Sequence, residues 1–140
     1  MSNWEIISNP ARVYDFVRKY TPVNMVAGSQ GLGLLRNGEL VAGVIYEGFN
    51  GKNVWMHVGA EPGRKWMNRR FLRAAFAYPF LQLGCTRVSG YVEAWNTDAR
   101  RFDEHLGFKH EATLTGAASD GGDVLLYVMK REECRHVNTQ

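Results

Sequence analysis

The chain has 140 residues, of which 45% are hydrophobic and 22% are charged, and its formal net charge is +3. This length allows one domain with a hydrophobic core and is too short for two, and the composition excludes a disordered chain. No apolar run approaches the roughly 20 residues that a membrane-spanning helix needs, and the first residues lack the basic and apolar regions of a secretory signal. We therefore expect one cytoplasmic domain over residues 1–133, a short tail over residues 134–140 and no membrane partner.

The first part of the chain predicts a strand followed by a helix. Residues 4–7 form a short strand candidate. Asn9 and Pro10 then combine a helix cap with a first-turn proline, and apolar residues at helical spacing continue to Tyr20.

A three-stranded antiparallel meander is expected next. The dipeptide Asn37-Gly38 separates two apolar runs, over residues 31–36 and 39–46, and this dipeptide is typical of a tight β-hairpin. A third apolar run over residues 54–58 supplies the next strand.

The second half of the chain alternates helices with strands. Apolar residues spaced by three and four predict a long helix over residues 64–83, in which Pro79 should kink or shorten the last turn. The remaining elements are a strand over residues 87–92, a helix over 98–106, and strands over 108–114 and 124–129. The resulting order, β, α, β, β, β, α, β, α, β, β, predicts an α/β fold with helices on a mixed, largely antiparallel sheet.

The basic residues are unevenly spread. Five of them fall within ten positions, namely Arg64, Lys65, Arg69, Arg70 and Arg73. Such a cluster indicates an anionic ligand, either the phosphate groups of a cofactor or a nucleic acid. For any single arginine, a solvated surface position explains the charge equally well.

The cysteines and histidines do not predict a metal site. Cys85 and Cys134 lie far apart without a CxxC partner, and the four histidines add no metal-ligand spacing. We expect two free thiols in a reducing compartment. A catalytic cysteine lacks a neighbouring base or activating charge in the sequence.

The stretch from Asn96 to Phe108 carries a spaced motif. It has an asparagine, a small residue three positions on, an apolar residue six on, Gly-Phe eleven and twelve on, and a glutamate soon after: Asn96, Ala99, Phe102, Gly107, Phe108 and Glu111. In physical terms the asparagine caps a helix, the alanine permits close approach of a ligand, and the glycine ends the helix in the left-handed region. Together with the order of strands, this motif resembles the GNAT superfamily of acyl-CoA-dependent N-acyltransferases.

Two further segments resemble one branch of that superfamily. Residues 76–88 and 123–133 are similar to the enzymes that acetylate the N-termini of ribosomal proteins, and they indicate a phage or bacterial member. The resemblance implies the GNAT fold, acetyl-CoA as co-substrate and direct attack on it by a primary amine of a small molecule or a protein. It also allows a homodimer.

The resemblance implies a set of residues for acetyl-CoA: Val58, Gly59, Gly63, Arg64, Lys65, Trp66, Met67, Asn68, Arg69, Asn96 and Phe102. A backbone N–H near Val58 and Gly59 would face the thioester oxygen, and a bulge at that glycine would open the sheet. The chain departs from the family at the pyrophosphate loop, where Trp66 and Asn68 stand in place of the two glycines. Either the basic side chains compensate for the missing glycines or acetyl-CoA binding has been lost.

The catalytic residues follow less directly. Many members of the family use a tyrosine seven residues after the asparagine as the general acid, and Asp103 occupies that position here. Asp103 can serve only if burial raises its pKa well above about 4; otherwise it is a solvated helix residue, and the acid is Tyr127, another residue or water. His57, with an ordinary pKa of about 6.5, and Glu61 are the candidate bases on the acceptor side. The resemblance implies an acceptor pocket built from residues 14–30 and 115–123.

Two other functions remain as alternatives. The first is a GNAT-fold binding module without turnover. The second is a small nucleic-acid-binding domain that uses residues 64–73, with Trp66 and Phe71 as stacking groups.

Overall fold

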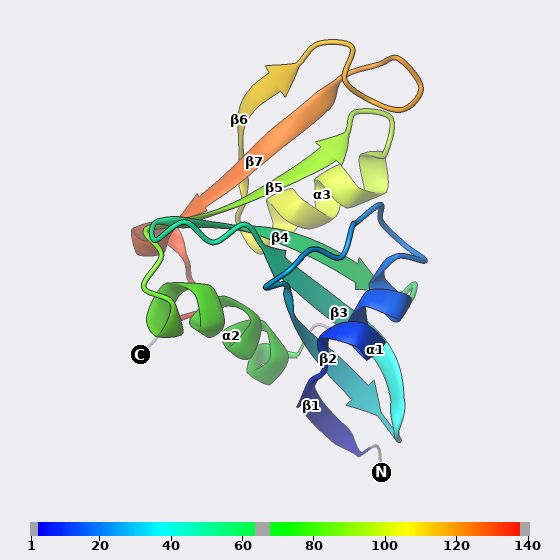
Figure 1. Ribbon diagram of the computed structural model, residues 1–140, viewed down its shortest axis with the longest axis vertical. Coiled ribbons are helices and arrows are strands. Elements are labelled where there is room, and N and C mark those ends of the chain that lie inside the picture. Colours follow the sequence, from blue (N-terminus) through cyan, green and yellow to red (C-terminus); the bar gives the residue numbers. More distant parts are fainter. Residues whose placement is uncertain (1–2, 64–67, 138–140) are drawn as a thin grey trace.

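The computed structural model describes residues 3–63 and 68–137, and within them the strands form one seven-stranded sheet of order β1-β2-β3-β4-β5-β7-β6 (Figure 1). The elements are β1 (Trp4–Ser8), α1 (Pro10–Val17), β2 (Gln30–Arg36), β3 (Glu39–Glu47), β4 (Asn53–Ala60), α2 (Arg69–Ala77), β5 (Arg87–Glu93), α3 (Thr97–Leu106), β6 (Lys109–Leu114) and β7 (Val124–Lys130). A π-helical turn (Tyr78–Gln82) follows α2, and a 3₁₀ turn (Arg131–Glu133) follows β7. The predicted α/β class and order of elements are confirmed.

The hairpin between β2 and β3 forms where the sequence predicts it. Asn37 and Gly38 both adopt positive φ, of 53° and 86°. Two left-handed residues in a row match the right-handed twist of the flanking strands, and asparagine and glycine tolerate that conformation best. The hairpin thereby sets the start of the meander.

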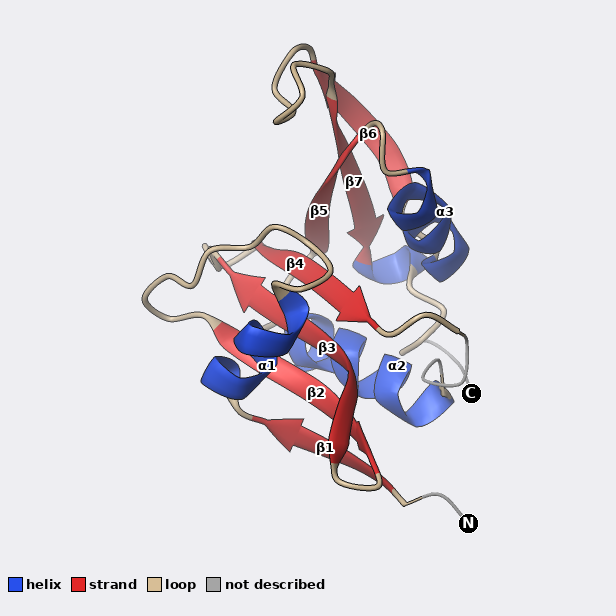
Figure 2. Ribbon diagram, turned by 90° about the vertical axis from the view of Figure 1, so that its right-hand side faces the viewer, coloured by secondary structure: helices blue, strands red, loops and turns tan. Residues whose placement is uncertain are grey.

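Helices cover both faces of the sheet (Figure 2). On one face, Val13, Phe16 and Val17 of α1 pack with Ile45 of β3. On the other face, α2 and α3 pack over the larger core, to which Phe76 and Leu106 belong. The chain continues in contact with this core past residue 133, because Cys134 is fully buried there.

The predicted helix over residues 64–83 is observed as two pieces, with residues 64–67 outside the described part of the chain. Asn68 caps α2 by accepting a hydrogen bond from the Phe71 N–H at 2.7 Å. Pro79 cannot donate to the carbonyl of Ala75, and the hydroxyl of Tyr46 donates to that carbonyl instead, at 2.5 Å. The chain then widens into the π-helical turn, as the predicted disturbance at Pro79 requires.

The central feature of the sheet is that β4 and β5 pair only at their beginnings. Their parallel pairing runs from Asn53–Arg87 to Trp55–Ser89. Beyond these residues the two strands diverge, and Figure 1 shows them leaving a common point and ending apart. We call the point of divergence the apex.

The bulge expected at Gly59 is absent, because the register between β3 and β4 runs unbroken up to the pair Ala42–Ala60. The opening in the sheet comes from the divergence of β4 and β5. Gly59 has a different role: a Cβ there would lie 3.0 Å from the Cα of Val17, so this glycine lets the end of α1 lie directly on β4.

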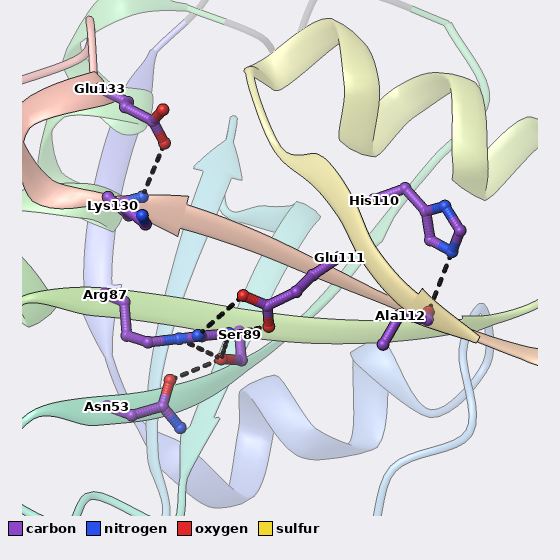
Figure 3. A network of polar contacts seen from close by, with 8 residues as sticks. All are labelled: Asn53, Arg87, Ser89, His110, Glu111, Ala112, Lys130 and Glu133. Atoms are coloured by element: carbon purple, nitrogen blue, oxygen red, sulfur yellow. Dashed lines mark hydrogen bonds and ion pairs between the residues drawn. The ribbon is translucent and has the colours of Figure 1, made fainter. Parts of the chain in front are cut away.

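A polar network ties the strands together just before they diverge (Figure 3). The buried Ser89 hydroxyl donates to Asn53 Oδ1 at 2.6 Å and accepts from the Arg87 guanidinium at 3.0 Å. The same guanidinium pairs with Glu111 of β6 at 2.7 Å. Because these bonds span β4, β5 and β6, they hold the apex in place.

Gly59→Ala should destabilise the protein. The added methyl group meets the backbone of Val17, which cannot rotate away, so α1 must shift and we expect a loss of about 1–2 kcal/mol. Thermal unfolding measures the effect. Gly90→Ala is the matched control in β5, because a Cβ there makes only an ordinary 3.5 Å contact with the Met56 carbonyl. Equal melting temperatures for the two variants would contradict this packing.

Candidate active site

A cavity of about 800 Å³ lies where the end of β4 faces α3, and we call it the cleft. Its walls come from the last residues of β4, the loop that follows them and one side of α3. The lining residues are Tyr20, Val58, Gly59, Ala60, Glu61, Pro62, Gly63, Asn96, Asp98, Ala99, Arg101, Phe102 and His105. The structure thus brings together six residues predicted for the site, namely Val58, Gly59, Glu61, Gly63, Asn96 and Phe102.

The edge of β4 offers backbone hydrogen bonds to the cleft. The Glu61 N–H donates to the Val41 carbonyl. This bond shows that the backbone N–H and C=O groups of odd-numbered residues in β4 point toward β3. Direction alternates along a strand, so the N–H and C=O of Met56 and Val58 point toward β5. Since β5 has diverged at that level, the polar groups of Val58 face the opening, whereas those of Gly59 pair with Gly43.

The beginning of α2 is unusually basic. Arg69, Arg70 and Arg73 are all exposed, and the first turn has no acidic residue. Cations are unfavourable at a helix N-terminus, where the helix dipole is positive, so this end of the helix is suited to an anion. Asn68 serves here as the helix cap. Four other residues predicted for phosphate binding, Arg64, Lys65, Trp66 and Met67, lie outside the described residues.

The beginning of α3 is arranged as the motif requires. The Asn96 side-chain oxygen accepts from the Ala99 N–H at 3.2 Å and so caps the helix. Both residues line the cleft, and Gly107 ends the helix with φ of 115°. The local structure predicted from the spacing is therefore confirmed, while the binding role of Asn96 stays a prediction.

His57 lies at the apex, on the face of the sheet covered by α1. Its buried ring places Nε2 3.2 Å from Glu47 Oε2 and packs edge-on against Tyr91, with ring centroids 5.3 Å apart. Burial lowers the pKa of His57, and Glu47 opposes this shift only in part. The imidazole is thus neutral at pH 7. Because a carboxylate only accepts hydrogen bonds, Nε2 carries the hydrogen and Nδ1 keeps its lone pair.

Glu47 and Tyr91 contact His57, and the sequence did not predict that they lie beside this candidate base. Glu47 is opposite Trp55 in the pairing of β3 with β4, and Tyr91 follows Ser89 on β5. Burial, and then the charge of Glu47, raises the pKa of Tyr91. No local spacing marks this group, because it forms only once three strands are placed in register.

The two candidate acids lie in different surroundings. Tyr127 is 1% exposed, and its hydroxyl donates to Glu104 Oε2 at 2.8 Å, beneath α3 and away from the lining of the cleft. Asp103 is partly buried, one helical turn from Ala99, and burial raises its pKa to about 7, with a smaller contribution from Glu104. An aspartate protonated at neutral pH can act as an acid, and this condition is met at Asp103.

Other chemistry is poorly supported in the described residues. Cys85 and Cys134 are buried free thiols whose pKa is raised by burial, which suits packing and not nucleophilic catalysis. Within residues 3–63 and 68–137, no group of three histidine, cysteine or acidic side chains is placed to hold a metal ion. In the same residues, no helix combines the length and apolar character needed to cross a membrane.

Comparison with known proteins identifies the fold. No protein-family model and no curated protein sequence matches the chain. Solved structures do match it. The spermidine/spermine N-acetyltransferase SpeG of Vibrio cholerae, solved with manganese ions, has a TM-score of 0.72 at 13% identity, over 91% of this chain and 92% of that one. A GNAT-family acetyltransferase of Bacillus anthracis has a TM-score of 0.61 at 18% identity, over 74% and 67%. The chain has the GNAT fold.

Asp103→Asn should stabilise the protein above neutral pH. The native carboxyl has a pKa of about 7, against about 4 when unfolded, so the unfolded state loses its proton first and native stability falls as pH rises from about 4 to 7. Asparagine cannot ionise and avoids this loss. Calorimetry should give a higher melting temperature than wild type at pH 8 and an equal one at pH 4.

Asp98→Asn is the control for this measurement. Asp98 lies in the first turn of the same helix, where a negative charge is favourable, so its removal should lower the melting temperature at pH 8. A wild-type protein whose stability is flat between pH 4 and 7, and unchanged by Asp103→Asn, would contradict the raised pKa.

Proposed function

We propose that this protein is an acetyl-CoA-dependent N-acetyltransferase that acetylates a primary amine by direct attack in a ternary complex. The observation that carries the proposal is the divergence of β4 and β5, which leaves the Val58 edge of β4 open to the cleft. The basic helix α2 begins at Arg69, shortly after the cleft residue Gly63 in the chain. The pantetheine chain of acetyl-CoA needs backbone hydrogen bonds, and its phosphates need positive charge.

Two parts of the donor, the pantetheine chain and the phosphates, have suitable partners among the described residues. The amides of a pantetheine chain can pair with the free edge of β4 as an added strand would. Its phosphates suit the N-terminus of α2. There the positive charge of Arg69 and Arg70 compensates for the backbone N–H contacts that the family's glycine loop would make. Acetyl-CoA brings the activated carbonyl carbon; the protein must deprotonate the amine, stabilise the oxyanion and protonate the leaving sulfur.

Each of these tasks has a candidate group. Neutral His57, held by Glu47, can take a proton from the incoming ammonium at Nδ1. The Val58 N–H faces the opening and can donate to the developing oxyanion. Asp103, with its pKa near 7, can give a proton to the thiolate, while Glu61, on the cleft wall, is the second candidate base.

The balance of the reaction follows from these roles. The amine nitrogen forms a bond to the carbonyl carbon as the carbon–sulfur bond breaks, giving an amide and a thiol. The ammonium nitrogen loses two protons on becoming the amide nitrogen: one is balanced by the proton that the leaving thiolate gains, and the other is released to solvent. The fold shared with amine acetyltransferases supports this chemistry, and the resemblance of residues 76–88 and 123–133 adds protein N-termini to the acceptors worth testing.

The finer features are part of the same proposal: a cytoplasmic enzyme of phage or bacterial origin, able to form a homodimer. The nucleic-acid alternative loses one of its stacking groups, because Phe71 is 1% exposed and packed in the core. A binding module without turnover has the same donor site and is separated from an enzyme only by measured thiol release.

Acetyl-CoA should raise the melting temperature of the protein, because a ligand of the native state stabilises it. The double variant Arg69→Ala, Arg70→Ala should bind acetyl-CoA about tenfold or more weakly by calorimetry, with little change in its own melting temperature, since both side chains are exposed. Lys19→Ala removes an equally exposed charge elsewhere and should bind normally. Absence of a shift with acetyl-CoA or CoA would refute the proposal, and a shift without thiol release from any amine would favour the binding module.

His57→Gln should lower kcat/KM by about 10²-fold or more, the usual scale for a general base. In the wild type, kcat/KM should rise with pH through a pKa below 6.5, because His57 must lose its proton to act as the base. Above about pH 7 kcat/KM should fall again, because Asp103 loses the proton that it gives as the acid. The variant should lose the rising limb and keep the falling one. A rising limb that persists in His57→Gln would assign the base to another residue, with Glu61 next to be tested.

A further inference from the structure

We infer that the acceptor binds as a cationic amine between the Glu47 carboxylate and the rings of Tyr91 and Trp55, and that amines with an adjacent carboxylate are rejected. This inference rests on the proposed acetyl transfer and names the substrate class of that site. The three residues, which we call the cation site, lie on the face of the sheet covered by α1.

Glu47 is a partly buried carboxylate without a permanent positive partner. Its side chain is 24% exposed, and within residues 3–63 and 68–137 its ion-pair contact is with His57. Burial lowers the pKa of that histidine, so at neutral pH the contact is a hydrogen bond from a neutral ring. A carboxylate drawn partly out of water is stabilised by a cation, and among the described residues Glu47 has no ion pair with a lysine or arginine.

Two aromatic rings complete the site. Tyr91 is 44% exposed and packs edge-on against Trp55, with ring centroids 5.9 Å apart and an angle of 61° between the planes. Its contact with the His57 ring is also edge-on, at 78°. Because Tyr91 is 44% exposed, part of its side chain stays open to solvent, and ammonium groups bind favourably over aromatic faces.

The position of the site is the one that an attacking amine needs. Trp55 and Ser89 are the last paired residues of β4 and β5, and His57 and Tyr91 are the next residues of each strand on the same face. The cation site therefore lies at the apex, next to the candidate base. An ammonium held at Glu47 would lie near the His57 ring, whose Nε2 is 3.2 Å from that carboxylate.

Two carboxylates on this face oppose an anionic acceptor, and Arg87, on the same face of β5, is already paired with Glu111. Glu93 follows Tyr91 on the same face of β5 and stays ionised, because hydrogen bonds from Ser119 and Trp95 lower its pKa. Trp95, 60% exposed, extends the aromatic surface beyond it. The arginines at the start of α2 lie on the opposite face of the sheet, so the two substrates meet potentials of opposite sign.

The test compares acceptors that differ only next to the amine. The set is 2-phenylethylamine, phenylalanine amide and phenylalanine. At the carbon that bears the amine, the first carries only hydrogen, the second a neutral amide and the third a carboxylate. With wild-type protein and saturating acetyl-CoA, kcat/KM for 2-phenylethylamine should exceed that for phenylalanine by about tenfold or more, with the amide nearer to the amine. Equal values for the amine and phenylalanine would overturn the inference and leave acetyl transfer standing.

Variants separate binding from the positioning of His57. Glu47→Gln should reduce the preference for 2-phenylethylamine over phenylalanine about tenfold, whereas a variant that only misplaces His57 lowers both rates equally and keeps their ratio. Tyr91→Leu should raise KM for the amine more than it lowers kcat, and its exposed position keeps the fold intact. Glu39→Gln, an exposed carboxylate at the other end of β3, should leave the ratio at the wild-type value. An unchanged ratio in Glu47→Gln would remove Glu47 from specificity.

Calorimetry without turnover makes the two proposals separable. Protein saturated with CoA should bind 2-phenylethylamine, and the Glu47→Gln variant should bind it about tenfold more weakly. Binding with no thiol release would refute the enzyme and keep the cation site. Failure of both the binding and the preference would overturn the inference.

Discussion

The divergence of β4 and β5 is the constraint on which the rest of the site depends. Two parallel strands that pair over only three positions leave backbone groups unsatisfied, and buried backbone groups need partners. The network of Asn53, Ser89, Arg87 and Glu111 holds the strands together up to the apex, and α3 and the loop after β4 keep them apart beyond it. The opening is thus a built feature, and a ligand with amide groups is the natural partner for its edge.

The two faces of the sheet at this opening serve opposite charges. The face covered by α2 and α3 meets a helix N-terminus with three exposed arginines, which suits phosphate. The face covered by α1 presents Glu47, Glu93 and exposed aromatic rings, which suits an ammonium. This separation suits a transfer reaction between an anionic donor and a cationic acceptor, because each face attracts one substrate and repels the other.

Much of the fold was predictable because its signals are local. Asn37 and Gly38 determine a hairpin through their own backbone preferences, and Asn96 and Gly107 cap the two ends of α3. The Glu47–His57 pair was not predictable, because it depends on the register between strands. The prediction of a bulge at Gly59 was wrong, again because the answer depends on residues far away in the sequence. A glycine in a strand can mark a bulge or permit close packing, and only the position of Val17 shows that Gly59 does the second.

Residue-resolved amide hydrogen exchange, followed by NMR with and without acetyl-CoA, tests the central claim most directly. The Val58 amide points into the opening and should exchange rapidly in the free protein, then slow by about tenfold or more when acetyl-CoA binds. The neighbouring Gly59 amide pairs with β3 and should be slow in both states. A Val58 amide that is already protected in the free protein, or that is unchanged at saturating acetyl-CoA, would contradict the proposed role of the β4 edge.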